Sequence, residues 1–262
     1  MSAFEFNTIL IIGATSGIGW ALAERFVTEG RQVIISGRRQ ERLDEFTSKY
    51  PGVKSYVFDC TETGTIHRFA STVATENPTL DCVILNAGKQ RGFNFARPET
   101  VDLSIIDDEV LTNYTSQLHL TQAFLPYLLK KEKASLVYTT SGLAMVPLGR
   151  CPNYCATKAA LHHFCISLRA HLKDTSVRVI EIMPPAVQTE LHDEKYQPDI
   201  KNGAALGMPL QAFVDETWED LVKGQEHDEY PIGMAKHWYN QIEPVRHEAG
   251  KILPMTPANV DV

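Results

Sequence analysis

The chain has 262 residues, of which 44% are hydrophobic and 22% are charged. A chain of this length and composition can bury a large core as one domain or as two small ones. Its 25 basic and 32 acidic residues give a formal net charge of −7 without a long run of lysine and arginine. This charge argues against a nucleic-acid or acidic-membrane partner and leaves small molecules and proteins as candidate partners.

Targeting signals and cysteine usage indicate the compartment. No apolar run approaches the roughly 18 to 20 residues that span a bilayer. The opening stretch, MSAFEFNTILIIG, lacks the basic region and the cleavage site of a secretory signal. The five cysteines are odd in number and scattered, as is typical of buried thiols in a reducing compartment. We therefore expect a cytoplasmic protein with no membrane partner.

Short apolar runs alternate with helical patterns along the chain. The runs cover residues 8–12, 33–36, 54–58, 82–85, 135–140 and 177–182, and a last one lies near 229–233. The helical patterns include residues 20–30, 61–74, 104–130, 209–223 and 234–241. Nearly continuous apolar runs are typical of strands that helices cover on both faces. The alternation predicts an α/β fold in one domain, with a single doubly wound parallel sheet of about seven strands.

The first of these runs leads directly into GATSGIG, residues 13–19, and then into a helix. Gly13 allows a tight exit from the strand, Gly17 lets a ligand approach the backbone, and Gly19 allows close packing of helix on strand. The helix N-terminus would then face a phosphate. The segment predicts a dinucleotide site rather than a plain turn, formed by Gly13, Thr15, Ser16, Gly17, Ile18 and Gly19.

The end of the second strand distinguishes the two nicotinamide cofactors. A carboxylate there binds the ribose hydroxyl of NAD(H), whereas a cation accommodates the 2′-phosphate of NADP(H). Gly37 stands where an acidic residue would be expected, and Arg38 and Arg39 follow it. The sequence favours NADP(H) over NAD(H), with Arg38 as the phosphate ligand. A solvated basic turn is the alternative.

A tyrosine and a lysine lie four residues apart in NYCATKAALHHF, residues 153–164. On a helix this spacing puts Tyr154 and Lys158 on one face. Hydride transfer to a carbonyl develops negative charge on its oxygen and needs a proton donor beside it. Tyr154 could be that donor, since the Lys158 ammonium would lower the pKa of its phenol. Ser141, just after the strand at 135–140, could hydrogen-bond the carbonyl oxygen. An ordinary amphipathic helix and a turn serine are the alternatives.

Several motifs occur in a fixed order: Gly13-x-x-x-Gly17-x-Gly19, NAG at 86–88, Asn113, Ser141, Tyr154-x-x-x-Lys158, and PPAVQT from Pro184. Together they resemble the short-chain dehydrogenase/reductase family over about residues 8–192, with its Rossmann-type fold. The resemblance implies an NAD(P)(H)-dependent oxidoreductase, most simply one that reduces a ketone or aldehyde with NADPH or runs the reverse reaction. It implies that Tyr154 is the general acid/base, that Lys158 also holds the nicotinamide ribose, and that Ser141 orients the carbonyl.

The same resemblance implies further roles. Asn113 would hold a water in a proton relay rather than being an ordinary exposed helical residue. Asp59 would contact the adenine, unless it only caps the following helix. The adenosine ribose would be contacted by Asn86, Ala87 and Gly88. The nicotinamide would be contacted by Pro184, Val187 and Thr189. Pro185 replaces the family's glycine and puts the backbone path around the nicotinamide in doubt. A homodimer or homotetramer is also implied.

Residues 190–216 form a stretch too long for a simple connection and predict a lid. With Leu143, Met145 and Val146 the lid would form a mainly apolar pocket, which favours a small neutral ketone or aldehyde, or its alcohol, as substrate. An irregular extension is expected over 251–262. Two other function classes stay open, an NADPH-binding regulatory or interaction protein and an epimerase, dehydratase or imine reductase on the same fold. Cys151, Cys155, His162 and His163 could form a zinc site, but no second half with ligand spacing exists, so we expect no metal.

Overall fold

The computed structural model describes residues 4–224 and 227–251. Within these ranges seven parallel strands form one sheet in the order β3-β2-β1-β4-β5-β6-β7. The strands are β1 (Thr8–Ile12), β2 (Gln32–Gly37), β3 (Lys54–Val57), β4 (Cys82–Leu85), β5 (Ala134–Thr139), β6 (Val177–Met183) and β7 (Glu229–Pro231). The predicted doubly wound parallel sheet is confirmed, with each strand close to its expected range.

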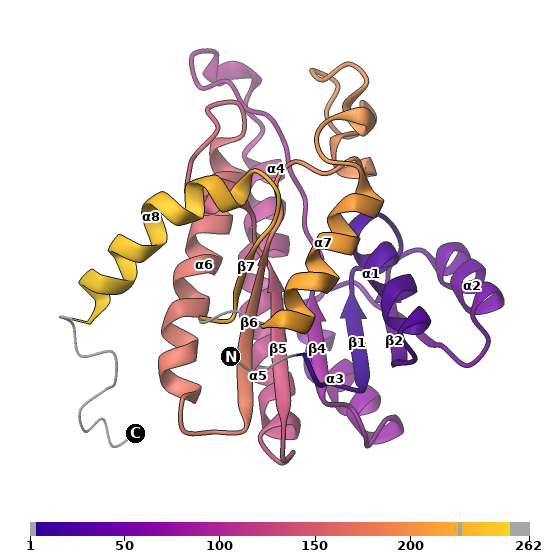
Figure 1. Ribbon diagram of the computed structural model, residues 1–262. Helices are drawn as coiled ribbons and strands as arrows, with labels where there is room; N and C mark the ends of the chain where they lie inside the picture. Colours follow the sequence, from indigo (N-terminus) through magenta and orange to yellow (C-terminus); the bar gives the residue numbers. More distant parts are fainter. Residues whose placement is uncertain (1–3, 225–226, 252–262) are drawn as a thin grey trace.

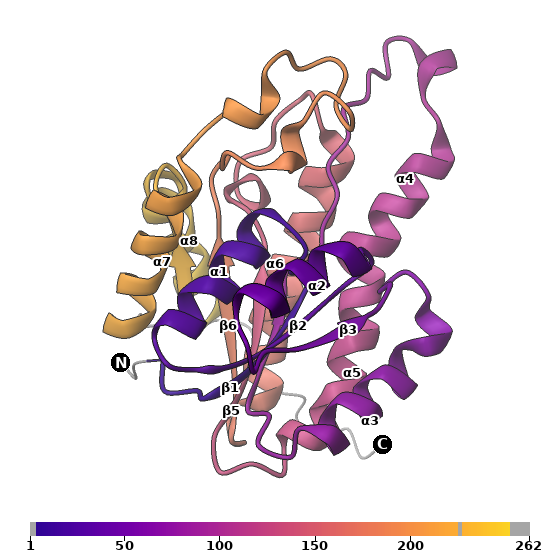
Figure 2. The same ribbon diagram turned by 90° about the vertical axis from the view of Figure 1, so that its right-hand side faces the viewer.

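Helices cover both faces of the sheet (Figures 1 and 2). They are α1 (Gly17–Thr28), α2 (Gln40–Lys49), α3 (Ile66–Glu76), α4 (Leu103–Val110), α5 (Ser116–Leu128), α6 (Pro152–Leu172), α7 (Leu210–Lys223) and α8 (Ala235–Gly250). Successive strand residues point to opposite faces. Ile9 and Ile11 of β1 accordingly join the core under α1, α2 and α7, whereas Leu10 and Ile12 join the core under α3, α5 and α6.

Helix α3 begins at Ile66 rather than at the expected residue 61, and two other helices differ more strongly from their sequence-based prediction. The helix expected over 104–130 is interrupted by a π-helical turn at Leu111–Thr115, between α4 and α5. Helix α8 continues to Gly250, nine residues beyond the expected end, although Pro244 lies inside it. Buried Glu243 holds this later part of the helix against α6, because its carboxylate lies 3.3 Å from His162 Nε2. Of the expected irregular extension, residues 252–262 lie outside the described residues.

The segment expected to form a lid contains two short 3-10 turns, Glu190–His192 and Gly203–Ala205. Its last residues are helical, because α7 begins at Leu210 and packs beside α1. The irregular part of the segment therefore ends at residue 209. Figure 1 shows it in orange above the end of the sheet.

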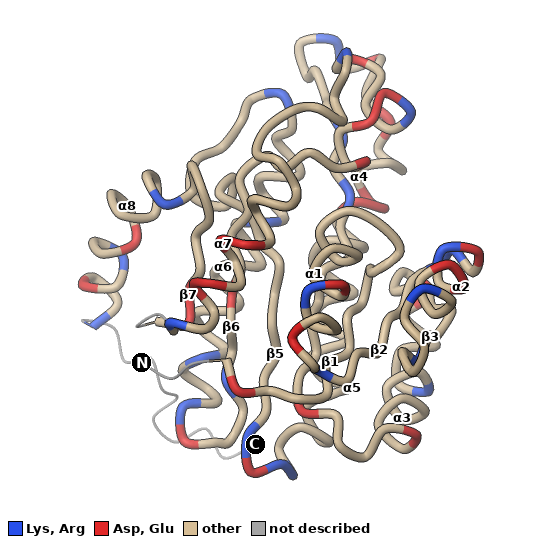
Figure 3. The backbone as a smooth tube through the Cα atoms, turned by 45° about the vertical axis from the view of Figure 1, so that its right-hand side comes forward, with Lys and Arg blue, Asp and Glu red and all other residues tan. Residues whose placement is uncertain are grey.

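The cysteines form no disulfides, and charged residues of both signs are mixed over the described part of the chain. All five cysteines are free and buried. Figure 3 shows Lys and Arg interspersed with Asp and Glu over the described part of the chain. No described helix combines the length and the apolar character needed to cross a bilayer.

Candidate active site

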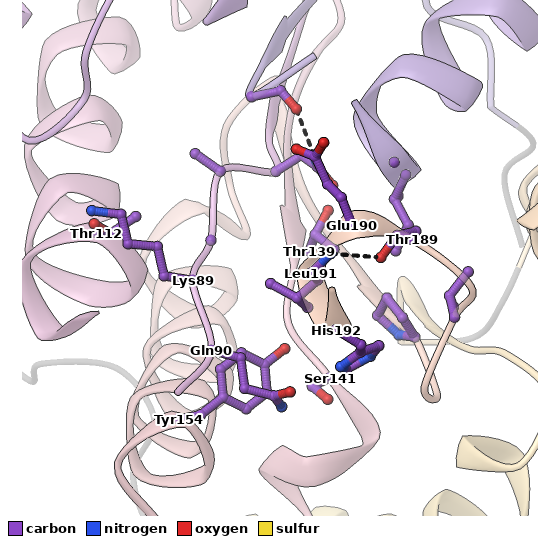
Figure 4. A pocket seen from close by; sticks show the side chains of 18 of the residues that line it. Lys89, Gln90, Thr112, Thr139, Ser141, Tyr154, Thr189, Glu190, Leu191 and His192 are labelled. Carbon is purple, nitrogen blue, oxygen red and sulfur yellow. Dashed lines mark hydrogen bonds between the residues drawn. The ribbon is translucent and has the colours of Figure 1, made fainter. Parts of the chain in front are cut away.

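A cavity of about 530 Å³ opens at the carboxyl ends of the strands. The strand order reverses between β1 and β4, and crevices at such a reversal are the usual ligand sites of open α/β sheets. Figure 4 shows part of its wall. The predicted site residues that line the cavity are Gly13, Thr15, Ser16, Gly17, Ile18, Arg38, Asp59, Asn86, Ala87, Gly88, Ser141, Tyr154, Lys158, Pro184, Val187 and Thr189. Gly19 and Asn113 do not line it and lie behind its wall.

The glycine-rich turn is packed too closely for side chains. Gly13 has a φ of +89°, and a Cβ there would lie 2.7 Å from the Ala87 backbone. A Cβ at Gly19 would lie 2.2 Å from the carbonyl oxygen of Gly13 and 2.6 Å from Asn86 Nδ2. The Asn86 amide in turn donates to the Gly13 carbonyl at 2.9 Å. Gly19 is therefore a packing residue that lets α1 approach the end of β1.

An anionic group already sits at the start of α1. Ser16, the N-cap residue, makes no capping bond, and the first helical turn contains no acidic residue. The Ser16 hydroxyl instead donates to the carboxylate of Glu190, which lies 2.7 Å from Arg39 Nη2. Although burial acts to raise it, these contacts keep the pKa of Glu190 below its ordinary value. The polar groups here thus bind an anion, as a phosphate site requires.

The end of β2 lacks room for an acidic side chain. A Cβ at Gly37 would lie 2.6 Å from Thr15 Cγ2. Next to it, the Arg38 side chain is 60% exposed, and its Nη1 lies 3.8 Å from Asp59 Oδ2. The other Asp59 oxygen accepts bonds from the Thr61 amide at 2.9 Å and the Thr61 hydroxyl at 2.7 Å. Asp59 therefore caps the turn after β3 with one oxygen and faces Arg38 across the cavity with the other.

The other end of the cavity brings together a serine, a tyrosine and a lysine. Ser141 follows β5, whereas Tyr154 and Lys158 lie one turn apart on α6. All three are buried, and Figure 4 shows the Tyr154 and Ser141 side chains near one another. Lys158 Nζ donates to the Thr139 carbonyl at 2.7 Å and lies 5.6 Å from the centre of the Tyr154 ring.

The protonation of this pair differs from the sequence-based expectation. Burial raises the pKa of Tyr154 well above its ordinary value, and the hydrogen bond with Ser141 offsets only part of this effect. Burial also lowers the pKa of Lys158 to about 8. The group whose hydrogen bond lowers the pKa of Tyr154 here is Ser141, while Lys158 Nζ donates to the Thr139 carbonyl; the lowering expected from Lys158 stays a prediction. At neutral pH Tyr154 is therefore a protonated phenol, which can donate a proton.

Asn113 occupies the π-helical turn and is fully buried. Its Nδ2 donates to the carbonyl of Lys89 at 2.8 Å and to the Thr157 hydroxyl at 3.1 Å, and its Oδ1 accepts from the Lys89 amide at 2.8 Å. It is thus not an exposed helical asparagine. A Cβ at Gly88 would lie 3.5 Å from Asn113 Oδ1 and 3.6 Å from Lys158 Nζ. Asn113 accordingly fixes the loop after β4 beside Lys158.

Comparison with known proteins decides the family. The family profile described as short chain dehydrogenase matches residues 7–199. This chain belongs to the short-chain dehydrogenase family. Membership makes it an oxidoreductase that acts on alcohols or carbonyls, and it confirms the resemblance seen in the sequence.

Named relatives support this placement. The chain is 40% identical to the "uncharacterized oxidoreductase DltE" of Bacillus subtilis (strain 168), over 84% of this chain and 86% of that protein. It is 31% identical to the "NADP-dependent 3-hydroxy acid dehydrogenase YdfG" of Shigella flexneri, over 73% of this chain and 77% of that protein. A crystal structure of a short chain dehydrogenase from Burkholderia cenocepacia J2315 in complex with NADP shares the fold, with a TM-score of 0.77 and 24% identity over 98% of this chain and 100% of the other.

In this short-chain dehydrogenase the segment after β6 accommodates its extra proline. The Gly142 amide donates to the Pro184 carbonyl at 2.8 Å. Pro185 lines the cavity, and its Cγ lies 3.4 Å from the position of a Cβ at Gly233. Val187 is buried and bridges to Met208, and Thr189 Oγ1 accepts from the Leu191 amide at 3.4 Å. These contacts hold the segment along the cavity wall.

The cavity of this short-chain dehydrogenase also includes residues that the sequence did not single out. They are Gln90, Arg150, Glu190, His192, Tyr196 and Trp238, among others. Glu190 and His192 lie within three residues of PPAVQT and inside the segment predicted to form a lid, but no residue pattern in that segment distinguishes them. Leu143 lines the cavity as expected, whereas Met145 and Val146 do not; Leu148 of the same loop lines it instead.

The histidines considered for zinc have other partners. His162 Nδ1 lies 2.9 Å from Glu181, and His162 Nε2 lies 3.3 Å from Glu243. The His163 ring contacts Arg246 on α8. Both rings therefore face acidic or basic side chains, and they do not converge on Cys151 and Cys155, which pack with Leu143.

Proposed function

We propose that this protein is an NADPH-dependent reductase that converts a ketone or aldehyde to an alcohol, or runs the reverse reaction. One observation carries the proposal. A single cavity joins a phosphate-type site, formed by the glycine-rich turn and Arg39, to a buried serine, tyrosine and lysine. A hydride-transfer enzyme needs both parts in one cleft, because the cofactor and the proton donor act on the same carbonyl.

The residues of the cavity fit the cofactor. The open N-terminus of α1 would hold its diphosphate, and Arg38 and Arg39 its 2′-phosphate. Asp59 would contact the adenine, and residues 86–88 the adenosine ribose. Lys158 would hold the nicotinamide ribose, with Pro184, Val187 and Thr189 around the nicotinamide. The cofactor would supply the hydride.

The preference for NADP(H) over NAD(H) is part of the proposal. It is supported by the absence of space for an acidic side chain at Gly37, by the two arginines that follow it, and by the NADP dependence in the name of one relative. Arg39 matters here as much as Arg38, because its guanidinium already binds a carboxylate beside Ser16.

The proton chemistry follows from the protonation of the site. Ser141 would donate a hydrogen bond to the carbonyl oxygen and fix its position. The neutral Tyr154 phenol would deliver its proton to this oxygen as negative charge develops there. Lys158, held by the Thr139 carbonyl, would stabilise the phenolate that remains. We assign Asn113 to the relay that returns a proton to Tyr154, because Asn113 lies beside Lys158 behind the wall of the cavity.

The substrate end of the cavity supports a small, mainly apolar carbonyl compound without net charge. Its apolar wall consists of Leu143, Leu148, Ile200, Leu206 and Trp238. Two of these residues, Ile200 and Leu206, belong to the 190–209 segment, and this supports the role of that segment as a lid.

We further propose that the chain forms a homodimer or homotetramer in the cytoplasm. Exposed apolar side chains near α4, among them Phe95, Leu103 and Ile105, support an interface there. The free, buried cysteines suit a reducing compartment. Light scattering coupled to size exclusion would measure the mass, and a monomer would contradict this part.

The test of the proposed reaction is NADPH consumption by the purified protein with a panel of ketones, aldehydes and diketones, followed by product identification. The proposal predicts stoichiometric formation of an alcohol. A product that retains its carbonyl, or an amine from an imine, would assign the protein to another reaction class. Confirmed NADPH binding without turnover of any carbonyl would favour a regulatory role.

A further inference from the structure

One wall of the substrate end is polar, and it is built on His192. This residue ends the Glu190–His192 turn, is 6% exposed, and lines the same cavity as Tyr154 and Ser141. Figure 4 shows its ring pointing into the part of the cavity that Ser141 and Tyr154 also face. A carbonyl compound bound at Tyr154 therefore shares this cavity with the His192 ring.

The backbone of His192 has little freedom. Gly203 of the second lid turn approaches it so closely that a Cβ there would lie 1.7 Å from the His192 carbonyl oxygen. Behind the ring, Gln197 is buried and its Nε2 donates to the Leu191 carbonyl at 2.5 Å and to Gln90 Oε1 at 3.1 Å. Gln90 is itself buried, and it contacts Cys151 three residues before Tyr154. The ring is thus tied to both the lid and the catalytic helix.

These contacts determine which ring nitrogen carries the proton. Two oxygens surround Gln197 Nε2, so this atom is the amide nitrogen of the side chain. Both hydrogens of this amide point to those two oxygens, so its 3.4 Å contact with His192 Nδ1 is not a third hydrogen bond. Because an amide nitrogen cannot accept, this contact suits a lone pair rather than a hydrogen at Nδ1. A neutral ring with an acceptor at Nδ1 carries its hydrogen on Nε2. Burial, together with nearby Arg150, lowers the pKa of His192, in agreement with a neutral ring.

The Nε2–H group has no acceptor among the residues that the structure describes. The nearby cation, Arg150, is already paired with Asp199, because its Nε and its Nη2 each lie 2.6 Å from one oxygen of that carboxylate. The cavity wall therefore offers one uncharged donor, the His192 Nε2–H group. The charge of the neighbouring Arg150 is compensated by Asp199, and many of the other side chains around the cavity are apolar. A donor that faces the cavity without a protein acceptor can be satisfied by a ligand oxygen.

We propose that His192 is a specificity-determining residue whose Nε2–H binds a second, uncharged oxygen of the substrate, so that the preferred substrates are keto esters, diketones or their hydroxy counterparts. This inference rests on the proposed carbonyl reduction and names its substrate class.

The test compares two substrates of similar size, ethyl acetoacetate and 2-heptanone, which differ in the second carbonyl. We expect wild-type kcat/KM to favour the keto ester by about 10-fold or more, because a site built around a hydrogen bond discriminates against a ligand that lacks it. His192→Leu should remove this preference while 2-heptanone changes by less than about 3-fold. His192→Gln, which keeps an N–H donor, should restore part of the preference.

Two controls separate the possible failures. Lys201→Ala changes an exposed residue of the same lid that does not line the cavity, and it should leave both substrates unaffected. NADPH affinity and the melting temperature show whether His192→Leu keeps its fold. Equal losses for both substrates in His192→Leu, or an unchanged preference, would overturn the role of His192. If His192→Leu lowers kcat/KM for acetoacetate but not for ethyl acetoacetate, the claim that His192 binds an uncharged oxygen is overturned. If wild type reduces other carbonyl compounds of the panel but neither of these two ketones, the inference about His192 fails alone; if it reduces no carbonyl compound of the panel, the proposed function itself fails.

Discussion

Glu190 gives a sharp prediction about cofactor binding, because its carboxylate occupies the anion site at the start of α1. In the proposed function, NADPH would have to displace it from Ser16 and Arg39 before its own phosphates could bind there. The Arg39–Glu190 pair is short, at 2.7 Å, but its side chains are 34% and 40% exposed. Solvent therefore screens the attraction, and the pair contributes about 1 kcal/mol rather than several.

Glu190→Gln removes the charge and keeps neutral hydrogen bonds. A gain of about 1 kcal/mol corresponds to about 5-fold tighter binding of NADPH. The gain should be smaller for NADH, which lacks the 2′-phosphate that replaces Glu190 at Arg39. It should also shrink as salt is raised, because both the pair and the phosphate contact are screened. Titration of cofactor fluorescence at low and high salt measures both effects.

Glu194→Gln is the matched control, since this carboxylate belongs to the same lid and does not line the cavity. It should leave the Kd for NADPH unchanged. If Glu190→Gln binds NADPH no better than wild type, or more weakly, then the carboxylate does not compete with the cofactor. The anion site at α1 would then have to be reconsidered.

Two further predictions concern selectivity and stability. Arg38→Asp should raise the Kd for NADPH by about 10- to 100-fold and that for NADH by less than about 3-fold; equal losses in a fluorescence titration would contradict the assignment to the 2′-phosphate. His162→Leu should lower the free energy of unfolding in urea by about 3 to 5 kcal/mol near neutral pH, because it removes the cation between the buried carboxylates of Glu181 and Glu243, whose remaining ion-pair partners among the described residues include Arg169 and Arg246. Although burial acts to lower it, Glu181 and Glu243 raise the pKa of His162 from 6.5 to about 10. The stabilisation of the fold by charged His162 is therefore complete below about pH 6.5 and is lost as pH rises through about 10. The difference in unfolding free energy between wild type and His162→Leu should shrink from about pH 7 to 10. A difference that stays constant over this range would refute a charged His162.

Local patterns in the sequence were enough to predict the sheet. Strands buried on both faces must be apolar along their whole length, so β1 and β4 match their predicted ranges without error. Helix ends were harder to predict. Pro244 would ordinarily end a helix, yet α8 continues past it because Glu243 makes a buried contact with His162, far away in the sequence. The π-helical turn at Asn113 likewise depends on contacts with Lys89 and Thr157.

The site was predictable where its residues form motifs, and not where folding brings single residues together. In the glycine-rich turn and in the Tyr154–Lys158 pair, the spacing of the residues along the chain is itself enough to predict a function. Glu190 and His192 have no such spacing. Glu190 reaches Ser16 from 174 positions away, and the proton of His192 depends on Gln197, which is hydrogen-bonded to Gln90, 107 positions away in the sequence. The raised pKa of Tyr154 also required the structure, because burial cannot be read from a four-residue spacing.

The central claim is that Tyr154 donates the proton in an NADPH-dependent reduction. The most direct measurement is kcat/KM for a carbonyl substrate with wild type, Tyr154→Phe and Tyr127→Phe, together with the Kd for NADPH of each. Tyr127 lies on α5 outside the cavity and controls for the loss of a tyrosine hydroxyl. We predict that Tyr154→Phe loses on the order of 10² or more in kcat/KM with little change in Kd, while Tyr127→Phe matches wild type. Full activity in Tyr154→Phe would contradict the account.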